Sequence, residues 1–211
     1  LAKDTTPNYP DPVQEAGAVA LKHYNFGTAE PSVPEWLNPA QIRKVIYRNE
    51  KYYILTEEPK LIVANAVNNT KIREMDLTGI TGGTRILSDI NFTSDGYLLA
   101  CNNETVGLPE TLGRYFKVYT WDNDSVAPKL LFQTQQQANW SNGVMGETFA
   151  VSGPRWKCTI YTPSVTTGST KAIRIIGYLY EEGQTAIGYK YMLDASNYTE
   201  ALWGQKMKFT I

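Results

Sequence analysis

The stretch Asn91–Cys101, NFTSDGYLLAC, decides the fold of this chain. It contains two strand-like runs separated by Asp95-Gly96, a dipeptide typical of a tight hairpin turn. A single hairpin fits many β folds, so the decisive point is whether this one recurs. The same pattern is found in VIYRNEKYYILT (45–56), FAVSGPRWKCTIYT (149–162) and EALWGQKMKFTI (200–211). The hairpin is therefore predicted to be one of four.

The four hairpins align on one turn residue each. These residues are Glu50, Gly96, Gly153 and Gly204. The positions three and five after each of them are apolar or aromatic in every copy: Tyr53 and Leu55, Leu99 and Cys101, Trp156 and Cys158, and Met207 and Phe209. Because residues two apart on a strand share a face, every copy is predicted to bury the same side.

Further strands are predicted between the hairpins. Each of the first three hairpins is followed by two more strand-like runs, joined by turn residues such as VNNT, NDSVA and EEGQ. Four-stranded units that recur at roughly 40–50 residues are typical of β-propeller blades, in which each blade covers its neighbour. We predict an all-β fold of propeller-like blades of four antiparallel strands, arranged as an incomplete ring of about three and a half blades. A β-sandwich with irregularly spaced hairpins is the alternative.

The chain is predicted to divide near residue 33. Residues 1–33 begin with the polar, proline-bearing run LAKDTTPNYPDP, which is typical of a tether, and they contain a candidate first strand. Residues 34–211 hold the propeller-like domain. A ring that is not closed leaves unpaired strand edges that recruit other strands. We therefore expect edge-to-edge association with another copy, or continuation of the ring by a longer chain.

Composition restricts the classes of partner. The chain has 211 residues, with Lys+Arg 20 against Asp+Glu 21 and a formal net charge of −1. Nucleic-acid binding draws on a basic excess that is missing here, and the net charge gives no attraction to an anionic membrane surface. No run of about 18 apolar residues occurs, so we predict no membrane span and no nucleic-acid partner.

No set of residues forms a recognised catalytic or metal-binding motif. His23 is the only histidine, so imidazole-based zinc sites and a Ser-His-Asp triad are not expected, and no metal or other cofactor is predicted. The adjacent pairs Glu57-Glu58 and Glu181-Glu182 cannot face one another across a substrate, although carboxylates from different blades could. Asp122–Ser125 fits a β-turn better than a calcium loop.

The two cysteines do not form a disulfide framework. Cys101 and Cys158 each lie in an apolar strand pattern, where a free thiol behaves as a small hydrophobe. Two buried thiols are therefore predicted. A single disulfide is the alternative, and it would indicate an oxidising compartment.

Aromatic residues exceed the needs of a core of this size. Five Trp and 14 Tyr are present, and both side chains offer an apolar face with a polar tip that suits sugars and protein interfaces. Tyr115, Tyr119 and Trp121 alternate along one predicted strand. Asn139 and Trp140 lie in the long amide-rich loop Gln133–Gly143. We predict these five residues to bind a ligand, with burial of the aromatic rings as the alternative.

One part of the chain resembles a known family. Gly79–Asn103, GITGGTRILSDINFTSDGYLLACNN, resembles a secreted Bacteroidetes family of unknown function whose members are β-propeller-like. The resemblance is carried by Gly82-Gly83, Asp89, Asp95-Gly96 and Asn102, continues through Phe116–Phe132 and covers residues 34–193. It implies export to the periplasm or cell surface, often with a lipid anchor, in bacteria that harvest glycans. It supplies no catalytic residues.

These features favour an exported, noncatalytic binding or interaction module for a glycan or a protein. A glycan-active enzyme with carboxylates from different blades is a second interpretation. A structural fragment completed by another chain is a third.

Overall fold

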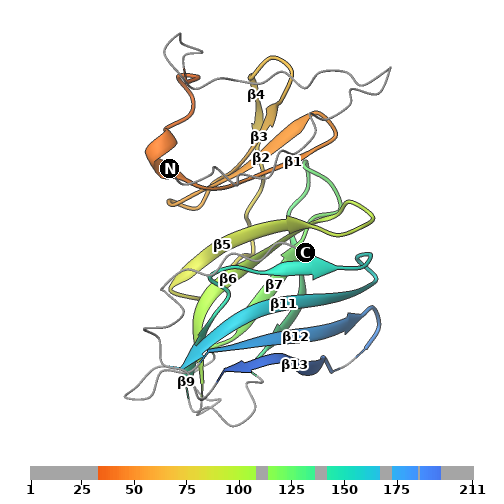
Figure 1. The fold of residues 1–211 in the computed structure, drawn as a ribbon. Coiled ribbons are helices and arrows are strands. Elements are labelled where there is room, and N and C mark those ends of the chain that lie inside the picture. The colour runs from red at the N-terminus through yellow and green to blue at the C-terminus, as the bar shows by residue number, and fades with distance from the viewer. Residues whose placement is uncertain (1–32, 108–113, 136–141, 167–172, 185, 196–211) are drawn as a thin grey trace, which may run out of the picture. The chain divides into compact units, whose positions relative to one another are not determined.

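The computed structural model describes residues 33–107, 114–135, 142–166, 173–184 and 186–195. The chain divides into two compact units, Leu1–Val33 and Pro34–Ile211, and every strand among the described residues belongs to the second. A 3-10 turn, Pro39–Gln41, precedes the first strand. The Asn38 side chain caps this turn by accepting a hydrogen bond from the backbone N–H of Ala40 at 3.1 Å. The remaining regular elements of the described residues are strands (Figure 1).

Twelve of the 13 described strands form three antiparallel meanders of four strands each (Figure 1). The first meander contains β1 (Ile42–Arg48), β2 (Lys51–Thr56), β3 (Leu61–Asn65) and β4 (Lys71–Glu74). The second contains β5 (Arg85–Phe92), β6 (Leu98–Gly107), β7 (Phe116–Thr120) and β8 (Lys129–Thr134). The third contains β10 (Ala150–Ser152), β11 (Lys157–Thr166), β12 (Ile173–Glu181) and β13 (Gly188–Ala195). The all-β class and the propeller-like four-stranded units of an incomplete ring are confirmed. The fourth predicted hairpin, 200–211, lies outside the described residues.

A strand that the sequence did not predict joins two of the meanders. Strand β9 (Asn142–Met145) pairs antiparallel with Glu104–Gly107 of β6 and with Ser164–Thr166 of β11. The second and third meanders thereby become one curled sheet, whose main path runs β13-β12-β11-β9-β6-β7-β8. The loop predicted at Gln133–Gly143 is corrected accordingly, because its first two residues end β8 and its last two begin β9.

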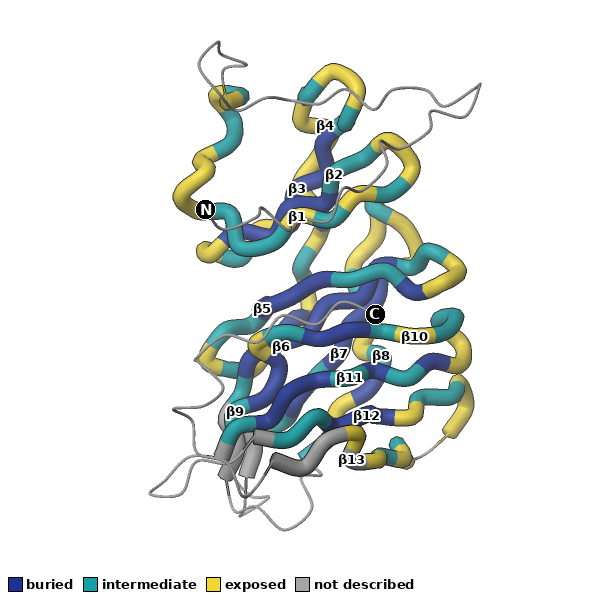
Figure 2. The backbone as a smooth tube through the Cα atoms, in the orientation of Figure 1, coloured by how far each residue is buried: buried dark blue, intermediate teal, exposed yellow. Residues whose placement is uncertain are grey.

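The middle meander is covered on both faces. Along β6, Leu98 and Ala100 belong to a core cluster shared with the first meander. The alternate residues, Leu99 and Cys101, belong to a second cluster shared with the third meander. Successive side chains on a strand point to opposite faces, so this continuous apolar run fills two cores at once. Figure 2 shows the dark buried segments along β5 and β6. Burying one such leucine contributes about 1.5–3 kcal/mol.

One predicted core position is wrong. Tyr53 and Leu99 are buried as expected, but Trp156 is 54% exposed. In the third hairpin the glycine lies further from the next strand: β11 begins four residues after Gly153, whereas β6 begins two residues after Gly96, and the backbone N–H of Lys157 donates to the carbonyl of Pro154 at 3.0 Å. A count from Gly153 therefore places Trp156 in the turn, and the inward positions of this copy belong to Cys158 and Ile160 instead.

A buried carboxylate connects all three meanders. The side chain of Asp89, on β5, is 4% exposed and pairs with Nζ of Lys44 on β1 at 2.8 Å. Its second oxygen accepts hydrogen bonds from the Thr148 hydroxyl at 2.7 Å and the Phe149 N–H at 2.9 Å, just before β10. A buried charge is tolerated only when it is paired and hydrogen-bonded, and Asp89 meets both conditions.

Both cysteines are free and buried in the core shared by the second and third meanders. Desolvation by burial raises the pKa of the Cys158 thiol to about 12. Desolvation raises the pKa of Cys101 as well. Both groups are therefore protonated, unreactive thiols at neutral pH.

Candidate functional site

A pocket of about 340 Å³ lies where the turns of the first two meanders meet. We call this the turn-end pocket. Its lining comes from the β1–β2 turn, the β5–β6 turn and the segment between β7 and β8. In the first turn, Asn49 and Glu50 both have positive φ values of 48° and 58°, as a two-residue hairpin requires. In the second, Gly96 has φ 93°, and a Cβ there would clash with the Arg48 guanidinium.

Aromatic rings form one part of the pocket lining. They come from Tyr53, Phe92, Tyr97 and Trp121. The rings of Tyr53 and Phe92 meet edge to face, with centroids 5.0 Å apart. The indole N–H of Trp121 donates to the carbonyl of Asp76 at 3.0 Å, which fixes the ring. The aromatic wall is thus held by packing and hydrogen bonds in the absence of ligand.

Carboxylates form the polar part of the lining. Asp95, Asp122 and Asp124 contribute them, and Asn49 and Asn123 add amides. Hydrogen bonds from Lys129 and Arg155 lower the pKa of Asp122. Desolvation acts to raise the pKa of Asp95 and Asp124, but hydrogen bonds outweigh it and lower both. All three carboxyl groups are therefore ionised acceptors at neutral pH.

Most of the cationic side chains beside these carboxylates form ion pairs with them. Lys51 lies 2.6 Å from Asp124. Arg155 and Lys129 both pair with Asp122. The pocket is consequently close to electrically balanced, and it keeps carboxylate oxygens with unused acceptor capacity.

One side chain of the third meander contacts residues that line this pocket. Arg155, in the β10–β11 turn, pairs with Asp122 and lies over the Tyr97 ring at 3.9 Å from its centroid. Two hydrogen bonds hold that turn against the β5–β6 turn: the Ser94 N–H donates to the Gly153 carbonyl at 3.0 Å, and the Arg155 N–H donates to the Asp95 carboxylate at 2.9 Å. One edge of the pocket is thus supported from a neighbouring meander.

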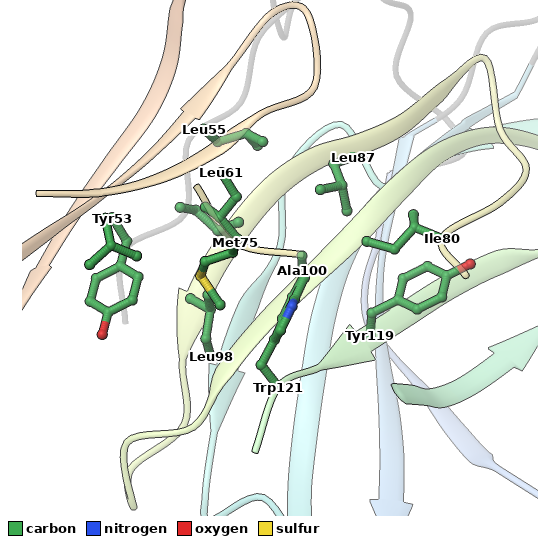
Figure 3. Packing of buried hydrophobic residues seen from close by; sticks show 12 residues of the cluster. Tyr53, Leu55, Leu61, Met75, Ile80, Leu87, Leu98, Ala100, Tyr119 and Trp121 are labelled. Carbon is green, nitrogen blue, oxygen red and sulfur yellow. The ribbon is translucent and has the colours of Figure 1, made fainter. Parts of the chain in front are cut away.

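The residues predicted to bind ligand have different locations in the structure. Trp121 and Tyr119 are 1% and 3% exposed and belong to the first core cluster, as Figure 3 shows. Trp121 also lines the turn-end pocket, whereas Tyr119 does not, and its hydroxyl exchanges hydrogen bonds with the backbone of Thr81. Tyr115 is half-buried ahead of β7. Asn139 and Trp140 lie outside the described residues.

The sequence did not point to most of the pocket. Tyr53, Tyr97, Asp95 and Asp124 belong to three separate turns or strand starts. A usable signal was present, because alternate joins of an antiparallel meander fall at the same end of its sheet. Side chains on corresponding turns of adjacent meanders therefore converge.

Among the described residues, no group of three or more His, Cys, Asp or Glu side chains is arranged to hold a metal ion. Within the same part of the chain, no helix has the length and apolar character needed to cross a membrane. Comparison with family models, curated proteins and solved structures finds no match to this chain. The geometry of the turn-end pocket is accordingly the basis for assigning a function.

Proposed function

We propose that the protein is an exported, noncatalytic binding module whose turn-end pocket holds a neutral carbohydrate. One observation carries the proposal: aromatic rings, carboxylates and amides line a single pocket of about 340 Å³. A pyranose ring has apolar C–H faces that suit aromatic rings and a rim of hydroxyls that donate to carboxylates. The volume lies at the small end of the range of about 300–1,000 Å³ for ligand pockets.

The charges of the pocket favour a neutral sugar over an acidic one. Three carboxylates line it, and the neighbouring Lys51 and Arg155 are already paired with two of them. An anionic sugar would meet the carboxylates of the lining, and Lys51, the cationic side chain within the lining, is already paired with Asp124, which is a penalty that discriminates between ligands. The hydroxyl groups of a neutral sugar, in contrast, can donate hydrogen bonds to the ionised carboxylates.

The pKa values favour binding over catalysis. A glycosidase needs one carboxyl group that is protonated near neutral pH, so its pKa has to be raised. The pKa values of Asp95, Asp122 and Asp124 are all lowered. The glycan-active enzyme interpretation therefore lacks a general acid among these three residues.

Export to the periplasm or cell surface, with a lipid anchor, is part of the proposal. It is supported by the resemblance of Gly79–Asn103 to the secreted Bacteroidetes family. Fractionation of the source cells tests it: a purely cytoplasmic protein would contradict export. Edge-to-edge association is a second candidate role, supported by the outer strands β8 and β13 of the curled sheet. Light scattering that reports a monomer at every concentration would contradict association between copies.

The carbohydrate proposal is tested by an array of neutral and acidic glycans followed by titration calorimetry on the hits. Tyr97→Ala removes a ring from the pocket and is expected to weaken binding at least about tenfold, which corresponds to 1.4 kcal/mol. Tyr47→Ala is the matched control, because Tyr47 is 60% exposed on β1 and does not line the pocket. Absence of binding to every glycan, or equal effects of the two substitutions, would refute the proposal.

A further inference from the structure

We infer that the ligand is an oligosaccharide chain rather than a single sugar, and that Trp156 forms a second subsite for it; this inference rests on the proposed carbohydrate function. The observations that carry it are the exposure of Trp156, the support of its backbone by hydrogen bonds and the contacts that its two neighbours make with pocket linings.

Trp156 presents a large apolar surface to solvent at a fixed place. It is 54% exposed, whereas Trp121 is buried in the core. Its backbone is held on both sides of the turn: the Trp156 carbonyl accepts the Glu182 N–H at 2.8 Å, and the Lys157 N–H bonds the Pro154 carbonyl at 3.0 Å. An exposed indole on a rigid turn loses little conformational entropy when a ligand stacks on it.

The two residues that flank Trp156 each contact the lining of a different pocket or belong to it. On one side, the preceding residue Arg155 stacks on Tyr97 and pairs with Asp122, both of which line the turn-end pocket. On the other side, the following residue Lys157 lines a second pocket of about 280 Å³. Trp156 is thus separated from the turn-end pocket by the Arg155 side chain, and it directly precedes a lining residue of the second pocket. A ligand of several sugar units, rather than a single ring, is therefore needed to contact both pockets and Trp156.

The second pocket has lining chemistry similar to that of the first. The Tyr180 side chain supplies an aromatic ring, and Gln184 supplies an amide. Lys157 and Glu181 form an ion pair of 3.0 Å, with side chains 57% and 42% exposed, so donors and acceptors remain accessible. This pocket is electrically balanced in the same way, and a chain of neutral sugar units suits both pockets and the indole between them.

The test is a titration with gluco-, manno- and xylo-oligosaccharides of one to six units. For the sugar series that binds, the affinity of the wild-type protein is expected to rise at least tenfold between one and four units. Trp156→Ala is expected to abolish this rise and leave the monosaccharide affinity unchanged. Trp156→Phe, which keeps an aromatic face, is expected to retain most of the rise. Tyr97→Ala is expected to lower the affinity at every length, and Tyr47→Ala at none.

The outcomes separate the two proposals. Absence of binding at every length overturns both the carbohydrate function and the second subsite. Binding with an affinity independent of length overturns the second subsite alone. A Trp156→Ala variant that loses monosaccharide and hexasaccharide affinity equally also overturns it, because the indole would then act on the first pocket. Urea unfolding of each variant checks that its stability is unchanged.

Discussion

Replacement of Asp89 by alanine is expected to destabilise the domain by about 3–5 kcal/mol, the usual cost of removing one partner of a buried ion pair. The Asp89 side chain is 4% exposed and lies 2.8 Å from Nζ of Lys44. It also accepts hydrogen bonds from Thr148 and Phe149 at 2.7 and 2.9 Å. Alanine leaves the Phe149 N–H without its acceptor, and an unsatisfied buried donor costs about 1–3 kcal/mol.

Equilibrium unfolding in urea, followed by circular dichroism, measures this loss. Asp89→Asn keeps the shape but removes the charge, so an intermediate loss of about 1.5–3 kcal/mol is expected. Glu58→Ala is the control, because Glu58 is exposed and its replacement is expected to change stability by no more than about 0.5 kcal/mol. A loss below about 1 kcal/mol for Asp89→Ala, with an unchanged m-value, would show that the carboxylate does not hold the three meanders together.

Three further predictions concern turns, thiols and pH. Gly146 and Gly183 have similar positive φ values of 80° and 84°, but a Cβ at Gly146 would overlap the carbonyl oxygen of Asn102, whereas nothing lies within 4 Å at Gly183. Gly183→Ala is expected to cost about 1–2 kcal/mol and Gly146→Ala clearly more; equal losses in urea unfolding would rule out the close approach. Because burial raises its pKa to about 12, Cys158 is expected to resist iodoacetamide at pH 8 in the native protein and to react in urea, as mass spectrometry would show; rapid native labelling would contradict its burial. Desolvation acts against ionisation of Asp124, but the Lys51 hydrogen bond outweighs it and lowers the pKa, so its stabilisation is complete above the unfolded value of about 3.9 and is lost as the pH falls through the folded value. Asp124→Asn should therefore flatten the pH dependence of the urea midpoint below about pH 4, and an unchanged dependence would contradict this pairing.

The repeat could be predicted because apolar residues recur three and five positions after each turn residue. In β6 the whole run Leu98–Cys101 is apolar, and the structure buries both of its faces, whereas the repeat had predicted burial of one. Trp156 could not be placed in the same way, because a count from the turn glycine assumes a constant position of that glycine, and Gly153 begins its turn whereas Gly96 lies near the end of its own. Strand β9 was missed because it is short and begins with Asn-Gly, which is turn chemistry in most contexts.

The site was harder to predict than the fold. Alternation along β7 indicated that Tyr119 and Trp121 share a face, but not whether this face meets the core or solvent. The turn-end pocket combines Lys51, Asp95 and Asp124, whose turns are brought together by the packing of one meander on the next. Such a site depends on tertiary arrangement and has no local motif.

Strand β9 limits which meanders could be inserted or deleted as whole units. The blades of a propeller are separate four-stranded sheets arranged around a central channel. Here deletion of the third meander would remove β11 from β9 and leave an unpaired edge along β9, which would still pair with β6. Among the described strands, the first meander forms a sheet of its own, whereas the second and third belong to one continuous sheet. We therefore expect the second and third meanders to be inserted or deleted only as a pair.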